Sequence, residues 1–122
     1  MSELRVILPW PPRALSPNSR PPHWAVLATA KRAYRSACHL EAMEAGWRKG
    51  AFAPTDRLHV RLVFVPPDRR RRDLDNLIAA MKSGLDGLAD ALGVDDSRWT
   101  LTCAIDEGGI GGMVRFGITR EV

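Results

Sequence analysis

Four stretches of the chain have the apolar patterning of β-strands. Leu4 to Leu8 is a short run that contains Val and Ile, and Leu58 to Val65 alternates before it becomes wholly apolar, as a strand entering a core does. Prolines follow both runs and prevent either strand from continuing. Trp99 to Ile105 and Met113 to Thr119 complete the predicted set of strands.

Two longer stretches have the period of a helix. Trp24 to about Trp47 contains no proline and places apolar side chains at helical intervals. A second helix is predicted from about Leu74 to Leu92, because its apolar residues fall within a narrow arc of a helical wheel. Gly93 follows at a position that suits the C-cap of this helix. The residues of the arc are Leu74, Leu77, Ile78, Met81, Leu85, Leu88 and Leu92.

The order of these elements predicts an α/β fold. The succession strand, helix, strand, helix, strand, strand favours a small mixed β-sheet of about four strands, with two main helices packed on one face. The glycine-rich segment from Asp106 to Gly112 joins the last two strands, and its glycines permit the positive backbone angles of a hairpin. A chain of 122 residues with 45% apolar content fits a single domain, residues 1–122.

The positive charge of the chain is unevenly distributed. The formal net charge is +4, and Arg69 to Arg72 alone account for the excess. Of the 18 basic residues 15 are arginine, which favours forked, weakly hydrated contacts with phosphate. A clustered basic patch points to nucleic acid, because no basic amphipathic helix indicates a membrane surface. A solvated arginine run in a loop is the alternative interpretation.

Several classes of protein are disfavoured. No apolar run approaches the roughly 18 residues of a membrane span, and no basic and apolar leader follows Met1, so we expect a cytoplasmic protein. Cys38 and Cys103 lie far apart without a CxxC motif, which disfavours a zinc site and a disulfide framework. Both are expected to be small buried residues. The histidines show no ligand spacing, and no motif indicates an organic cofactor.

Acidic residues beside the arginine run are candidate metal ligands. With Asp73 as the N-cap of the second helix, a helical wheel places Asp75, Lys82 and Asp86 on one flank of that helix. Lysine is long and side chains lean towards the helix N-terminus, so the ammonium of Lys82 can reach the neighbourhood of Asp75. As the alternative, Asp73 and Asp75 simply cap the helix and complement its dipole.

Two further acids, Asp95 and Asp96, follow the other end of this helix. They can join Asp73 and Asp75 only if the chain folds back along the sheet, and otherwise they are turn formers. Carboxylates that gather beside arginines repel one another unless a cation neutralises them. Mg²⁺ fits best, because it prefers oxygen ligands and binds through few carboxylates together with a substrate phosphate.

The segment from Pro67 to Leu77 and the triplet Asp95 to Ser97 resemble the signature of RusA-type Holliday junction resolvases. Leu8 to Pro12 and Ser16 to Arg20 are similar to the N-terminal pattern of this family. Lys82 to Leu88 resembles phage and prophage members. The resemblance covers most of the chain and implies a RusA-like fold.

The resemblance implies a homodimeric, Mg²⁺-dependent endonuclease, in which Mn²⁺ can replace Mg²⁺. Such an enzyme makes paired, symmetric incisions in four-way DNA junctions during recombination and repair. Asp73, Asp75 and Asp96 match the catalytic, metal-binding carboxylates, and Asp95 stands beside the matching position as a further metal ligand. Arg72 matches a basic residue tied to DNA binding or catalysis. The expected DNA contacts are Arg69, Arg70, Arg71, Arg72, Asn76, Arg20 and Lys31.

One position departs from the family pattern. The catalytic lysine of the family sits one helical turn after the second aspartate, where this chain has Ala79, and the nearest lysine is Lys82. Both positions lie on the same side of a helix, so we expect Lys82 to serve as the catalytic lysine that steadies developing negative charge. Two other functions stay open: a DNA-binding module without catalysis, and a less selective nuclease acting on flaps or forks.

Overall fold

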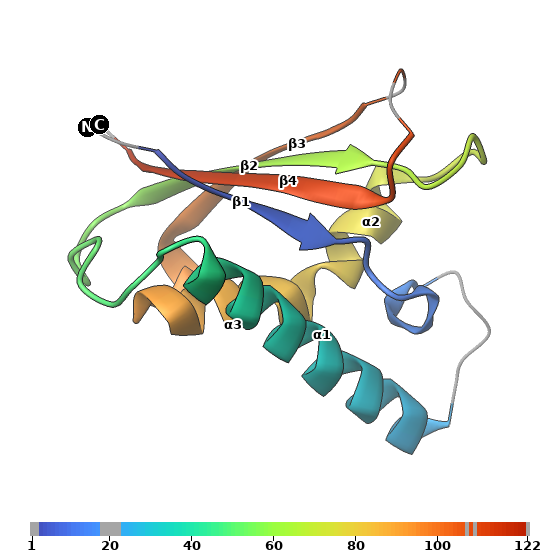
Figure 1. The fold of residues 1–122 in the computed structure, drawn as a ribbon, viewed down its shortest axis with the longest axis horizontal. Coiled ribbons are helices and arrows are strands. Elements are labelled where there is room, and N and C mark those ends of the chain that lie inside the picture. The colour runs from blue at the N-terminus through green and yellow to red at the C-terminus, as the bar shows by residue number, and fades with distance from the viewer. Residues whose placement is uncertain (1–2, 18–22, 107, 109, 122) are drawn as a thin grey trace.

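The computed structural model describes residues 3–17, 23–106, 108 and 110–121. Within them the strands are β1 (Leu4–Pro9), β2 (Leu58–Val65), β3 (Trp99–Ile105) and β4 (Met113–Arg120). The helices are α1 (Trp24–Glu44), α2 (Leu74–Ala80) and α3 (Lys82–Leu92), as Figure 1 shows. Two short 3₁₀ turns, η1 (Arg13–Leu15) and η2 (Asp96–Arg98), precede α1 and β3.

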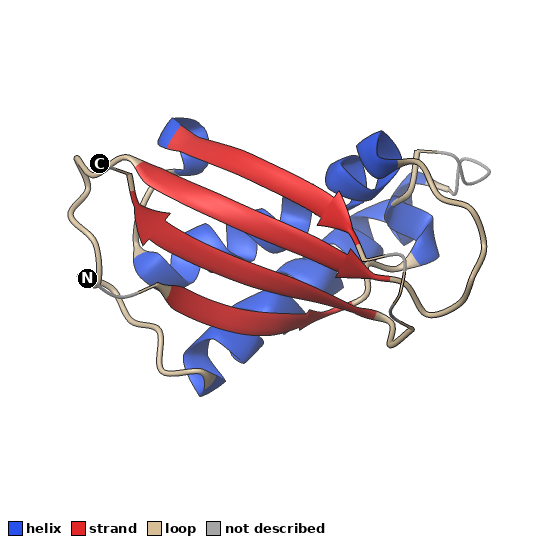
Figure 2. Cartoon of the chain, turned by 90° about the horizontal axis from the view of Figure 1, so that it is seen from above, coloured by secondary structure: helices blue, strands red, loops and turns tan. Residues whose placement is uncertain are grey.

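The strands form one mixed sheet in the order β1-β4-β2-β3. β4 is antiparallel to both of its neighbours, whereas β2 and β3 are parallel. All the helices lie on one side of the sheet, and the other face is open (Figure 2). The prediction of an α/β fold with a four-stranded mixed sheet and helices on one face is therefore confirmed.

The last two strands do not form the predicted hairpin. β3 pairs with β2 from Leu58↔Trp99 to Phe64↔Ile105, and β4 lies on the opposite side of β2. Glycines in the connection permit a turn, but they do not select the strand that each neighbour joins. β4 is a central strand of the sheet, and its residues Val114, Phe116 and Ile118 are buried.

The predicted second helix is two helices, α2 and α3, which meet at Met81. The backbone of Met81 has φ −83° and ψ −9°, and its N–H donates to the carbonyl of Ile78 three residues earlier. This tightened turn interrupts the α-helical ladder for one residue. Met81 is fully buried, and its sulfur accepts a hydrogen bond from the Tyr34 hydroxyl at 3.3 Å. The apolar residues of both α2 and α3 thus face the core, although the break at Met81 separates the two helices.

Close packing of α1 against α3 depends on glycine. A Cβ at Gly84 would lie 2.6 Å from Tyr34, and a Cβ at Gly87 would collide with the carbonyl oxygen of Arg35. Gly93 ends α3 with φ 68°, which confirms the predicted C-cap. Among the helices of the described residues, none has the length and apolar character that a membrane crossing requires.

The two cysteines differ in burial. Cys38 is fully buried between α1 and α3, and burial raises the pKa of its thiol to about 12. Cys103 lies on edge strand β3 and is only partly buried, so the prediction that it is a buried residue is wrong. Both are free thiols.

Candidate nucleic-acid and metal site

Asp73 and Asp75 stand at the start of α2, directly after the arginine run. Asp73 occupies the N-cap position in an extended conformation, but its side chain makes no capping hydrogen bond. Its carboxylate instead accepts a hydrogen bond of 3.4 Å from the amide of Asn76. The Asp75 side chain is exposed and makes no hydrogen bond or ion pair with another described residue. Neither carboxylate is therefore used to hold the helix together.

Asp68 organises the loop that carries the arginines. Its carboxylate accepts hydrogen bonds of 2.9 Å from the backbone N–H of Arg70 and from the guanidinium of Arg72. It also lies 3.4 Å from Nε of Arg70. The backbone N–H of Arg70, followed by the Arg72 guanidinium, lowers the pKa of Asp68 below its ordinary value. A carboxylate just before the run thus gives the loop a defined shape.

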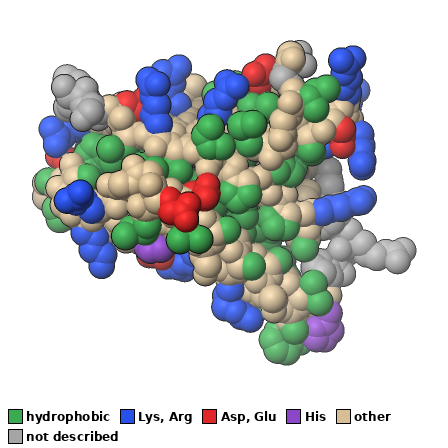
Figure 3. Space-filling view, in the orientation of Figure 1, with side chains coloured by type: hydrophobic (Ala, Val, Ile, Leu, Met, Phe, Trp, Pro, Cys, Tyr) green, Lys and Arg blue, Asp and Glu red, His purple; other side chains and the backbone are tan. Residues whose placement is uncertain are grey.

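The four arginines have different environments. The Arg72 side chain is only 18% exposed, donates to the carbonyls of Asp68 and Arg70, and lies over the Trp10 ring at 5.4 Å from its centroid. Arg69 and Arg71 are exposed and make no hydrogen bond or ion pair within the described part of the chain. The space-filling view shows basic side chains at the end of the molecule where this loop lies (Figure 3). Arg72 therefore holds the loop, while Arg69 and Arg71 point their charge to solvent.

Lys82, the first residue of α3, joins two acids. Its Nζ lies 3.1 Å from Asp86 and 3.2 Å from Asp96. Asp86 first, and then Asp96, raise the pKa of Lys82. The helical wheel predicted that Lys82 and Asp86 lie on the same side of the helix, and their ion pair agrees with this prediction. The chain also folds back after α3, because η2 carries Asp96 to the start of the same helix.

Asp96 forms an ion pair with Lys82, and among the described residues no hydrogen bond or ion pair links Asp96 to Asp73 or Asp75. The η2 turn that carries Asp96 leads into β3, whose first residue lies beside Leu58 at the start of β2. Among the described residues, no group of three or more His, Cys, Asp or Glu side chains is arranged to hold a metal ion. Asp95 accepts a hydrogen bond of 3.0 Å from the backbone N–H of Ser97 and serves as the N-cap of η2.

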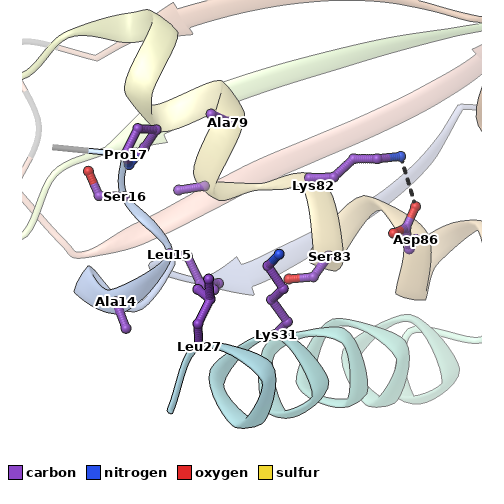
Figure 4. A pocket seen from close by; sticks show the side chains of 11 residues that line it. Ala14, Leu15, Ser16, Pro17, Leu27, Lys31, Ala79, Lys82, Ser83 and Asp86 are labelled. Atoms are coloured by element: carbon purple, nitrogen blue, oxygen red, sulfur yellow. Dashed lines mark hydrogen bonds and ion pairs between the residues drawn. The ribbon is translucent and has the colours of Figure 1, made fainter. Parts of the chain in front are cut away.

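A cavity of about 560 Å³ lies where η1, α1 and the junction of α2 with α3 meet. Lys31 and Lys82 line it together with Ala79, and Figure 4 shows the ammonium of Lys31 turned towards Ser83. The hydroxyl of Ser83 is buried and has no hydrogen-bond partner among the described residues. The cavity thus brings together one predicted DNA-binding lysine and the predicted catalytic lysine. Ser83 carries no signal in the sequence, because its environment depends on the break at Met81.

Arg20 lies outside the described residues. The three histidines have structural contacts: His23 accepts a hydrogen bond from Ala25 at the N-cap of α1, His39 lies 3.2 Å from the Gly87 carbonyl, and His59 lies between two threonines of β3. None of these contacts indicates a metal ligand.

The chain is similar to an uncharacterized bacterial protein. No family model matches the chain. A protein of Xylella fastidiosa (strain Temecula1 / ATCC 700964), described as an uncharacterized protein, is 41% identical over 92 residues. The aligned region covers 75% of this chain and 60% of that protein, so the chain spans about three fifths of the relative's length.

Proposed function

We propose that this protein is a RusA-like, Mg²⁺-dependent endonuclease that cuts branched DNA, with four-way junctions as its principal substrate. The observation that carries the proposal is the pair Asp73 and Asp75, two exposed carboxylates without a cationic partner among the described residues. They stand directly after a loop with four consecutive arginines. A purely structural role for Asp73 would be a capping bond, and the side chain makes none.

Asp73 and Asp75 are the residues that would hold Mg²⁺. Their carboxylate oxygens are ligands that Mg²⁺ prefers, and this ion commonly binds through one or two carboxylates, waters and a substrate phosphate. When bound, Mg²⁺ or Mn²⁺ supplies charge stabilisation at the phosphate and lowers the pKa of a water. Asp96 is the third carboxylate of the proposed catalytic set, and Asp95 is adjacent to it.

The basic side chains of the loop would bind the DNA backbone. Arg69 and Arg71 present exposed guanidinium groups, which suit bidentate contacts with phosphate. Arg70 forms an ion pair with Asp68. The partly buried Arg72 side chain also pairs with Asp68 and holds the loop in its conformation. Such contacts position DNA without reading its sequence, so the preference of the enzyme for a structure would come from the spacing of phosphates.

Lys82 would act as a fixed positive charge. Asp86 and Asp96 hold its ammonium in place and raise its pKa, so it stays protonated at neutral pH. A protonated lysine stabilises negative charge and does not serve as a general base. Ala79 and Lys82 line the same cavity, which supports the exchange of the family lysine between these two positions.

Two copies are expected to act on each junction. A four-way junction has two-fold symmetry, and paired incisions require two active sites related by the same symmetry. A DNA substrate in recombination or repair also places the protein in the cytoplasm.

The direct test is Asp75→Asn, assayed on a synthetic four-way junction with Mg²⁺. Because Asp75 has no described partner, we expect the variant to unfold at the same urea concentration as the wild type. We expect its cleavage rate to fall by about 100-fold or more, since a charge that acts at the reacting phosphate is lost. Glu44→Gln, an exposed acid at the end of α1, is the matched control and should cut normally. Undiminished paired cleavage by Asp75→Asn would contradict the proposal.

A DNA-binding module without catalysis is the second candidate. It requires only the exposed guanidinium groups of Arg69 and Arg71, which make no ion pair within the described residues. In this case wild-type protein binds junctions with an affinity that falls steeply as salt rises, and no metal produces cleavage. Equal cleavage of junctions, flaps and forks by the wild type would instead identify a less selective nuclease.

A further inference from the structure

The two edges of the sheet differ in chemistry. β1 forms one edge and carries Arg5 and Pro9, a charge and an imino acid that discourage the addition of another strand. β3 forms the other edge, and its sequence WTLTCAI contains no charge, proline or glycine. Leu101 in the middle of β3 is 44% exposed. An edge without such protection is a ready site for pairing with another strand.

The backbone of β3 offers regular hydrogen-bonding groups along its free side. Asp106 donates its N–H to the carbonyl of Phe64 in β2 at 2.9 Å. Because backbone groups alternate in direction along a strand, the groups of every second residue before Asp106 also face β2. The intervening residues, whose N–H and C=O groups face away from β2, are Trp99, Leu101, Cys103 and Ile105.

We propose that β3 pairs antiparallel with β3 of a second copy of this chain, about a two-fold axis at Thr102. In this register Leu101 faces Cys103 and Trp99 faces Ile105, so the outward backbone groups meet in hydrogen-bonded pairs. The remaining pairs join Thr102 to its own copy and Thr100 to Ala104, on the open face of the sheet. Each pair is uncharged, and all residues of β3 are used.

Charges at the two ends of the seam, the pair of β3 strands from the two copies, favour this register. Arg98, just before β3, faces Asp106, just after β3 of the second copy, and the symmetry forms this pair twice. The Asp106 carboxylate also lies 4.0 Å from Arg115 and accepts a hydrogen bond from the backbone N–H of Gly108 in its own chain, so Arg98 would be an additional partner. Moving the axis to Leu101 would set Asp106 against Asp96, two like charges. Moving it to Cys103 would set Arg98 against Gly108 and lose the pair. Only the axis at Thr102 joins an uncharged seam to opposite charges at both ends.

The seam would continue the sheet of one copy into that of the other and place the helices of both on the same side. It would also cover Leu101, which otherwise exposes an apolar side chain at the edge. This inference deepens the proposed function, on which it rests only for the expectation of two copies. Its test measures association without DNA or metal. The dimer proposal can therefore fail while the cleavage proposal succeeds, and the cleavage proposal can fail while the dimer proposal succeeds.

The first experiment compares a lysine on each edge by light scattering after gel filtration. The wild type should have a mass of twice 13.5 kDa at micromolar concentration. Leu101→Lys should halve that mass, because it sets a charge within the seam. Ile7→Lys is the matched control, since Ile7 is a similarly exposed aliphatic residue of edge strand β1, and it should stay dimeric. A monomeric wild type, or a folded dimeric Leu101→Lys, would overturn the proposal.

The second experiment tests the register and does not depend on breaking the dimer. Thr102→Cys in a Cys103→Ser background should give a covalent dimer under mild oxidation, because a non-hydrogen-bonded pair brings the two Cα atoms close enough for a disulfide. Ala104→Cys in the same background should not, since Ala104 faces Thr100. Arg98→Asp should weaken association, and the double variant Arg98→Asp/Asp106→Arg should restore it. Cross-linking at position 104 but not at 102, or no rescue by the double variant, would refute this register.

Discussion

Exchanging single arginines of the loop should separate stability from DNA binding. Arg72→Ala removes hydrogen bonds of 3.2 Å and 2.9 Å to the carbonyls of Asp68 and Arg70, and the contact with Trp10. The two carbonyl bonds and the stacking together contribute about 2 kcal/mol, and the ion pair with the Asp68 carboxylate, which is 39% exposed, adds little. For a domain of this size that corresponds to a melting temperature lower by about 8 °C. Arg71→Ala removes no described contact, so its melting temperature should match that of the wild type.

DNA binding should show the opposite ranking. If Arg71 contacts a phosphate, Arg71→Ala should reduce the slope of log affinity against log salt by about 1. Arg72→Ala should leave this slope closer to the wild-type value when both are measured well below the melting temperature. The assays are differential scanning calorimetry and fluorescence anisotropy on a labelled junction over a range of salt concentrations. Equal melting temperatures for the two variants would refute the inward role of Arg72.

Three further outcomes are expected. Gly87→Ala should destabilise the protein by about 1–3 kcal/mol in urea unfolding, because the added Cβ collides with the Arg35 carbonyl and forces α3 from α1. Folding lowers the pKa of the Asp68 carboxyl below its ordinary value of 3.8. The ionised carboxylate therefore contributes to stability above pH 3.8, and this contribution is lost as the pH falls through the lowered pKa. The melting temperatures of wild type and Asp68→Asn should converge at that acidic pH. Lys82→Gln and Asp96→Asn should lower cleavage non-additively, because the two side chains form one ion pair.

Local patterns predicted the elements well. The bounds of β2 and β3 agree with the prediction, and α1 begins at Trp24 as expected. These segments are defined by apolar periodicity and by prolines or turns at their ends, which act within a few residues. The break at Met81 was not visible, because methionine favours helices and the apolar arc continues through it. At the break, Met81 contacts Tyr34 on α1, a residue that is distant in sequence.

Sheet order and the grouping of the acids needed the tertiary structure. The glycine-rich connection is compatible with a hairpin and equally with the longer path that carries β4 to the other side of β2. The same limit applies to Asp96, whose place depends on how η2 turns the chain after α3. The ion pair of Lys82 with Asp86 was accessible from sequence because the two residues are four apart on one helix. The pair with Asp96 was not.

The arginine run shows how identical neighbours acquire different roles. A free loop with four guanidiniums would lose much conformational entropy when it bound DNA, and this loss would weaken binding. Here Asp68 and Trp10 hold Arg72 in place, which would set the shape of the loop before the proposed DNA substrate binds. Arg69 and Arg71 then stay exposed beside Asp73, where the chain enters α2. If Arg69 and Arg71 bind phosphates as proposed, the anchoring of Arg72 would bring those phosphates next to the carboxylates proposed to hold the metal ion.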